Sequence, residues 1–104
     1  MTTFDDREKA FEKKFEKDQE LQFKVNARKN RLLGMWAAGQ LGKSGGDAEA
    51  YAKDVVMADF EKPGDDDVIA KVAKDLAAKG IDAGAVRKQA NICLAEAKKQ
   101  LMGE

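Results

Sequence analysis

The chain has 104 residues, of which 43% are apolar and 37% charged, so it can bury one small core and little more. It has one cysteine and no histidine, which excludes an internal disulfide, histidine metal sites and catalysis by Ser-His-Asp or Cys-His. Its net charge is zero with one short basic block, and no segment reaches the ~18 apolar residues that span a bilayer. We therefore expect neither a nucleic-acid partner nor direct membrane insertion.

The first helical pattern begins near Thr3 and can be followed to Leu41, but it changes face along its length. Three phenylalanines, Phe4, Phe11 and Phe15, fall within about 40° of one another at 100° per residue. The next apolar stripe is rotated from this one by about 80°. That second stripe contains Leu21, Val25, Leu32, Met35 and Trp36. The phenylalanine stripe is therefore a surface separate from the core.

The segment around the three rings is highly charged, because residues 1–20 carry seven acids and five bases. Such a segment could be a solvated tail, but a tail has no need of aligned rings. Burial of three phenylalanines contributes about 5–9 kcal/mol at most, and an isolated helix of this length is marginal in water. We therefore expect residues 1–18 to form an arm that is disordered or frayed when free. It should become helical where another surface buries the rings.

Three more helical patterns follow the glycine-rich segment GKSGGD. The second helix is expected after Asp47 as N-cap and ends at the break of residues 63–64. The third starts at Asp65 and stops at Gly80, and the fourth starts at residues 82–83. Short connections indicate antiparallel neighbours. The sequence thus predicts an all-α protein, a four-helix bundle over residues 19–104 with a mobile N-terminal helical arm over residues 1–18.

Each of these three patterns has an apolar face at helical spacing. The residues on these faces are Tyr51, Val55 and Phe60 in the second pattern, Val68, Val72 and Leu76 in the third, and Val86, Ala90, Cys93, Ala97 and Leu101 in the fourth. We interpret Cys93 as a buried structural thiol and Trp36 as a core anchor, with stacking on a base as the alternative for the tryptophan.

The segment AAGQLGKS, residues 37–44, fits the loose phosphate-loop pattern. A working phosphate loop follows a β-strand and opens a helix, whereas RLLGMW before this segment continues a helix. We interpret the match as coincidence and the glycines as residues that end a helix. No catalytic constellation is left, so we do not expect an enzyme.

Lys24, Arg28 and Arg31 share one helical face and could receive phosphates. The alternative is that they pair with the acids of residues 59–67. The sequence alone leaves both interpretations open.

Four segments in order, TFDDREKAFEKKF, NARKNRLLGMWAAGQLGKSG, AYAKDVVMADFEKPGDDDV and LAEAKKQL, resemble the ATPase-inhibitor zeta subunit family of the α-proteobacterial F-type ATP synthase. The similarity runs from about residue 3 to residue 101. The resemblance implies a four-helix bundle with a mobile arm. In this family the arm inserts as a helix at a catalytic αβ interface of the ATPase head, near the γ shaft, and blocks rotation in the hydrolysis direction.

The match to the family motif places the partner contacts on six arm residues, which are Phe4, Asp5, Asp6, Arg7, Phe11 and Phe15. By the same resemblance, the phenylalanines are apolar anchors, and Arg7 with the acids makes polar contacts. The resemblance also implies adenine nucleotide on the bundle, and Lys24, Arg28 and Arg31 are where we expect it. ATP or ADP would then be a regulatory ligand, and no cofactor is required.

The sequence therefore predicts a non-enzymatic inhibitor of ATP hydrolysis whose partner is the ATPase head, with its α, β and γ subunits. We expect a monomer when free, located in the cytoplasm, and at the cytoplasmic face of the inner membrane when bound. Two alternatives stay open at this point, an adenine-nucleotide-binding sensor and a helical adaptor that docks through the same arm.

Overall fold

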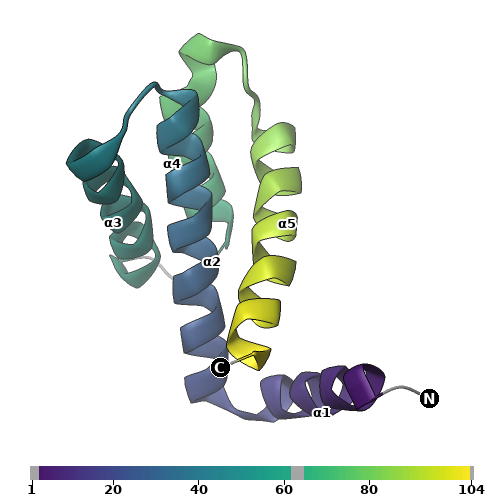
Figure 1. Ribbon diagram of the computed structural model, residues 1–104. Coiled ribbons are helices and arrows are strands. Elements are labelled where there is room, and N and C mark those ends of the chain that lie inside the picture. The colour runs from purple at the N-terminus through teal and green to yellow at the C-terminus, as the bar shows by residue number, and fades with distance from the viewer. Residues whose placement is uncertain (1–2, 62–64, 104) are drawn as a thin grey trace.

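A computed structural model describes residues 3–61 and 65–103, with residues 3–5, 60, 61 and 65 described by their backbone alone. The elements are α1 (Thr3–Lys17), α2 (Gln19–Gln40), α3 (Gly45–Glu61), α4 (Asp65–Leu76), a 3-10 turn η1 (Ala77–Lys79) and α5 (Ala83–Met102). Helices α2–α5 run alternately up and down side by side, and α1 crosses the lower end of this bundle (Figure 1). The all-α prediction is confirmed, as a bundle of four helices with an N-terminal arm. The break expected at residues 63–64 lies outside the described residues.

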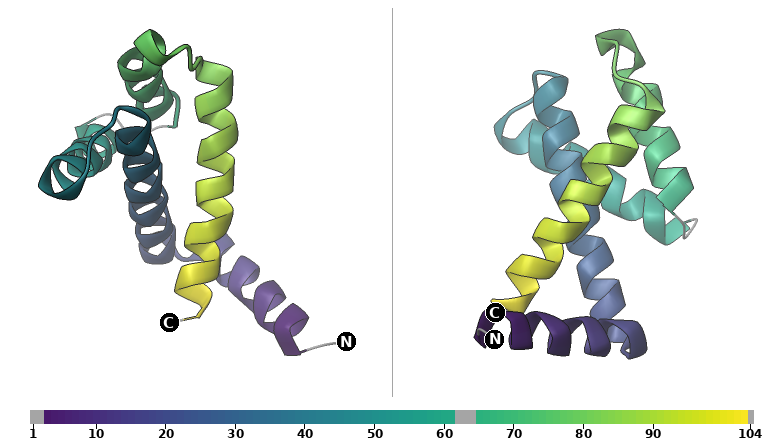
Figure 2. Two further views of the ribbon diagram at one scale, coloured as in Figure 1. Left: turned by 45° about the horizontal axis from the view of Figure 1, so that its top comes forward. Right: turned by 90° about the vertical axis from the view of Figure 1, so that its right-hand side faces the viewer.

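The first helical pattern, which could be followed to Leu41, forms two helices, because the chain turns sharply at Asp18 (Figure 2). Asp18 has an extended backbone, with φ −103° and ψ 105°, and its carboxylate accepts a hydrogen bond of 3.2 Å from the Leu21 backbone N–H. The Gln22 side chain donates to the Phe15 carbonyl at 2.7 Å, which satisfies a group at the end of α1. Both helix ends are thus capped where the apolar stripe changes face.

The hydrophobic core lies between α2, α3, α4 and α5. The predicted apolar faces of the last three helices are confirmed at nine positions, where the side chain is buried: Tyr51, Val55, Val68, Val72, Leu76, Val86, Ala90, Cys93 and Ala97. Leu101 is only half-buried, and the side chain of Phe60 lies outside the described residues.

The core face of α2 differs from the predicted one by a rotation of the helix. Its fully buried apolar side chains include Val25 and Leu33. Leu32, Met35 and Trp36 are half-buried and pack on the edge of this core. The difference arises because α2 contacts α3, α4 and α5. The positions of these three helices decide which side chains of α2 are buried.

The backbones of α2 and α3 approach closely at Gly34. A Cβ atom added at Gly34 would lie 2.6 Å from Cα of Ala52 and 3.1 Å from its Cβ. A real Cβ atom does not come this close to a backbone atom, so only glycine fits at this crossing.

The helix-ending interpretation of AAGQLGKS is confirmed. The Lys43 N–H donates to the Ala38 carbonyl at 2.9 Å, and the Gly42 N–H donates to the Gly39 carbonyl at 3.1 Å. Gly42 has φ +77°, so these bonds form a Schellman motif at the end of α2. The segment closes a helix, whereas a phosphate loop opens one.

The predicted N-cap of the next helix, Asp47, is wrong by three residues. Helix α3 begins at Gly45, whose φ is +56°, and the Ala48 N–H donates to the Ser44 carbonyl at 3.4 Å. The left-handed glycine lets the chain enter the helix early. Asp47 consequently lies in the first turn, where the helix dipole favours an acid. The predicted cap of α5 is confirmed, since Asp82 accepts from the Ala85 N–H at 2.8 Å.

A polar contact joins α3 and α4 at the edge of the core. The Tyr51 hydroxyl donates to Oδ2 of Asp75 at 2.8 Å, and Nζ of Lys71 lies 3.0 Å from the same oxygen. Burial raises the pKa of the Tyr51 hydroxyl well above its ordinary value, and the Asp75 carboxylate raises it further. Burial alone would raise the pKa of Asp75, but the hydrogen bonds from Lys71 and Tyr51 outweigh it and lower that pKa.

These shifts predict opposite losses of stability at the two ends of the pH scale. Tyr51 keeps its proton in the folded state at a pH where the unfolded chain ionises. Its contribution to the free energy of unfolding is therefore complete below pH about 10 and is lost above it. Asp75 contributes to the free energy of unfolding above pH about 3.9, and this contribution is lost as the pH falls below that value. We expect Tyr51→Phe to cost about 1 kcal/mol at neutral pH. Urea unfolding of both proteins should show a shallower alkaline decline for the variant, and equal slopes above pH 10 would contradict this assignment.

Within residues 3–61 and 65–103, no helix combines the length and the apolar character that a membrane crossing requires.

Candidate functional site: the arm and the end of the bundle

Helix α1 lies across the end of the bundle, under the last turns of α5 (Figure 2, right). It is joined to α2 through Asp18 alone, and it contacts both α2 and α5. It is helical from Thr3 to Lys17. The expectation that residues 1–18 fray in the free protein stays a prediction.

Arg7 reaches from the arm to the end of α5. Its Nη2 donates to the backbone carbonyl of Met102 at 3.0 Å. The last carbonyls of a helix have no partner within the helix, and the dipole favours a cation beside them. Arg7 thus caps α5 from outside. Its neighbour Asp6, another predicted contact residue, is exposed.

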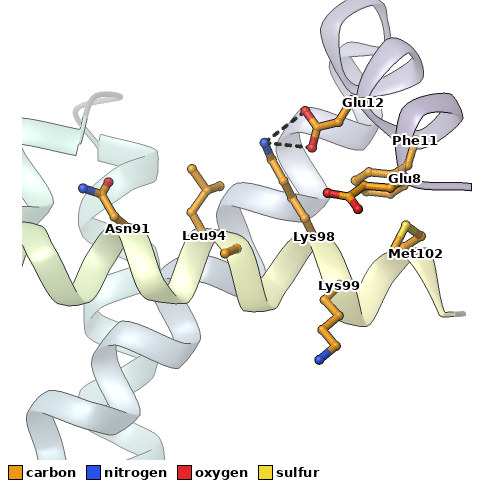
Figure 3. A pocket seen from close by; sticks show the side chains of 9 residues that line it. Glu8, Phe11, Glu12, Asn91, Leu94, Lys98, Lys99 and Met102 are labelled. Atoms are coloured by element: carbon orange, nitrogen blue, oxygen red, sulfur yellow. Dashed lines mark hydrogen bonds and ion pairs between the residues drawn. The ribbon is translucent and has the colours of Figure 1, made fainter. Parts of the chain in front are cut away.

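Lys98 of α5 makes two side-chain contacts with α1. Its Nζ lies 3.3 Å and 3.4 Å from the two carboxylate oxygens of Glu12 (Figure 3). The same ammonium lies 4.4 Å from the centroid of the Phe15 ring, which is cation–π distance. Its side chain is 24% exposed, against 44% for Glu12. Sequence reasoning missed Lys98, because nothing local marks a contact between residues 86 positions apart.

Phe11 lies beside an open cleft between α1 and α5. Leu94 and Met102 line the same cleft, with Glu8 on the side of the arm (Figure 3). Phe11 and Phe15 are both half-buried. The described part of the predicted stripe, Phe11 and Phe15, therefore faces α5, which covers part of both rings and leaves the rest accessible. The side chains of Phe4 and Asp5 lie outside the described residues.

The structure brings the three predicted nucleotide-binding residues together. Lys24, Arg28 and Arg31 line one shallow depression on the bundle, together with Phe23, Ala27, Val56 and Leu101. Lys24 lies 3.6 Å from Glu20, and Arg28 donates to the Gln100 side chain at 3.4 Å.

Arg31 pairs with Glu49, through contacts of 2.8 Å and 3.0 Å from its two terminal nitrogens. Its hydrogen bonds and charge lower the pKa of the Glu49 carboxyl. The expectation that Arg31 pairs with an acid of residues 59–67 is wrong, since Glu49 belongs to the first turns of α3, which pack beside α2. Much of the positive charge of this depression is already balanced within the protein.

Cys93 is 5% exposed on the core face of α5, and burial raises the pKa of its thiol. A raised pKa keeps the sulfur protonated, and a protonated thiol is a poor nucleophile. The structural interpretation of this residue is confirmed.

Comparison with known proteins bears on the whole chain. The family model described as ATPase inhibitor subunit zeta matches residues 1–100. A chain described as "Solution NMR structure of the protein" is 49% identical, with a TM-score of 0.72, and the match covers 80% of this chain and 96% of that one. A comparison with curated proteins gives no match. Members of the zeta family are non-enzymatic regulators of an F-type ATPase. Because the family model spans nearly every residue, this chain belongs to the ATPase inhibitor subunit zeta family.

Proposed function

We propose that α1 is the inhibitory element of this regulator. It leaves the bundle and enters a catalytic αβ interface of the F-type ATPase head, near the γ shaft, and there it blocks rotation in the direction of ATP hydrolysis. The protein acts at the cytoplasmic face of the inner membrane, where the head is located.

The observation that carries this proposal is the separation of α1 from the core. The buried core cluster is built from residues of α2–α5, beginning at Leu33 in chain order, whereas Phe11 and Phe15 are half-buried at the edge of the molecule. Movement of α1 about Asp18 would thus leave that cluster intact. An arm with aligned rings and a separately folded bundle is suited to wedge into another protein.

The charged residues of the arm would orient it on the partner. Rings buried at the centre of an interface supply affinity, whereas charged residues at its rim set register and the rate of association. Asp6 and Arg7 are exposed beside the stripe and can meet partner charges without desolvation of the whole arm.

The placement of α1 can be tested in the assembled complex of the full chain with its ATPase head. A photo-crosslinking residue at Lys13, exposed on the arm, should attach to the α and β subunits. The same residue at Lys53, exposed on α3, is the control and should not attach at the catalytic interface. An inhibited complex in which Lys13 attaches outside that interface would overturn the proposal.

Binding of ATP or ADP at Lys24, Arg28 and Arg31 stays a prediction. The three groups do line one depression, but the pair formed by Arg31 and Glu49 would have to rearrange before Arg31 met a phosphate. The functions of nucleotide sensor and helical adaptor have no observation in the structure that favours them over inhibition.

A further inference from the structure

We propose that Lys98 is a latch that holds the arm against α5 and thereby competes with the ATPase head for the same aromatic rings. This inference rests on the proposed function, because it concerns the regulation of the arm that acts on the head. It concerns the state of the protein before it meets its partner.

The latch is built from two contacts of a single ammonium group. Nζ of Lys98 is 3.3 Å from one Glu12 oxygen, and it is 4.4 Å from the centre of the Phe15 ring. The two groups stand one turn apart, at the i and i+3 positions of α1, so one cation meets both from the same side. Figure 3 shows the carboxylate of Glu12 turned toward this nitrogen.

The competition follows from the position of the rings. Phe11 lines the cleft against Leu94 and Met102, and Phe15 lies under the Lys98 ammonium. A face of a ring that is covered by α5 cannot at the same time be buried in another protein. The arm must therefore leave Lys98 before both rings are used in an interface.

The described contacts between α1 and α5 are at least partly accessible to water. The hydrogen bond from Arg7 to Met102 is exposed, and the cleft beside Phe11 shows that the apolar packing of α1 on α5 is incomplete. Ion pairs and cation–π contacts that water can reach are individually weak. The arm can thus leave α5 readily. Loss of Lys98 removes both the ion pair with Glu12 and the cation–π contact with Phe15.

The test uses Lys98→Gln, which removes the charge and keeps most of the side-chain stem. Lys99→Gln is the matched control, since Lys99 is the next residue, is exposed and lines the same cleft, but its ammonium extends away from Glu12 in Figure 3. Lys98→Arg keeps a cation that can pair with Glu12 and lie over the Phe15 ring, so arm exchange should stay close to that of the unchanged protein. All three variants are full-length chains.

Two measurements are made on each variant. Amide hydrogen exchange of residues 6–17 in the free protein should become about three- to tenfold faster in Lys98→Gln alone. The concentration that half-inhibits ATP hydrolysis should fall by a similar factor, because the arm no longer has to be released.

Unchanged arm exchange in Lys98→Gln would overturn the latch. Faster exchange with unchanged or weaker inhibition would overturn the competition, because it would mean that the contact with α5 does not oppose binding. Exchange is measured without the ATPase, so it reports on the latch even if the unchanged protein failed to inhibit, which would instead refute the proposed function.

Discussion

Replacement of Gly34 by alanine should destabilise the bundle, because the crossing of α2 and α3 leaves no room for a methyl group there. The new Cβ would stand 2.6 Å from Cα of Ala52, so α2 and α3 would have to move apart along their crossing. Overpacking of this kind typically costs about 1–3 kcal/mol. We expect a loss of about 2 kcal/mol in the free energy of unfolding, and a Tm lower by about 10 °C in thermal unfolding followed by circular dichroism.

The matched control is Gly39→Ala in the same helix. No atom lies within 4 Å of a Cβ added at Gly39, so this variant gains the helix propensity of alanine without a clash. It should be stabilised by up to about 1 kcal/mol. Equal Tm values for Gly34→Ala and Gly39→Ala would contradict the close approach of α2 and α3.

The second large effect is expected on inhibition. Simultaneous replacement of Phe11 and Phe15 by alanine should raise the half-inhibitory concentration at least about 100-fold, because each buried ring contributes about 1.5–3 kcal/mol. Titration of ATP hydrolysis by the cognate ATPase head measures this directly. Both rings are only half-buried in the free protein and lie outside the core cluster, so the bundle should still fold.

Phe23→Ala is the control for this double variant. Phe23 is an exposed phenylalanine of α2, with 54% of its surface accessible, and it lies beyond the arm. Its loss should leave inhibition nearly unchanged. The double variant also removes the ring beneath Lys98, and a weaker latch by itself would strengthen inhibition. A decrease in potency is therefore evidence for the rings as anchors, and a double variant as potent as the unchanged protein would refute that role.

The elements with a strong local signal could be predicted from the sequence. Val68, Val72 and Leu76 repeat at helical spacing on α4, and the structure buries all three. Asp82 precedes a run of helix formers, and it caps α5 as expected. The phenylalanine stripe could be distinguished from the core stripe because the spacing of residues within one helix shows which of them share a face.

Features that depend on contacts between distant segments could not be predicted. In the sequence, Gly34 is simply a residue of low helix propensity. The need for glycine there follows only from the position of Ala52 in α3. Asp18 is compatible with a helix surface, and only its capping of Leu21 reveals the turn. Lys98 belongs to a charged segment of α5, and its role depends on where α1 comes to lie.

The burial of Asn30 in the core is another feature that could not be predicted from the sequence. It is 1% exposed, and its side-chain amide has no hydrogen-bond partner within the part of the chain that the structure describes. Leu33, Val68 and Ile69 are among its neighbours. A polar residue in a charged stretch predicts an exposed position, but α2 is enclosed by three helices, so even this face is buried.

The central claim is that the arm exchanges a weak contact within the protein for a strong one with the ATPase head. Amide hydrogen exchange of residues 6–17, measured in the free chain and in the inhibited complex, tests it most directly. We predict weak protection in the free protein, as expected for a marginal helix held by few contacts, and strong protection along the phenylalanine stripe in the complex. Full inhibition with unchanged protection of these residues would contradict the account.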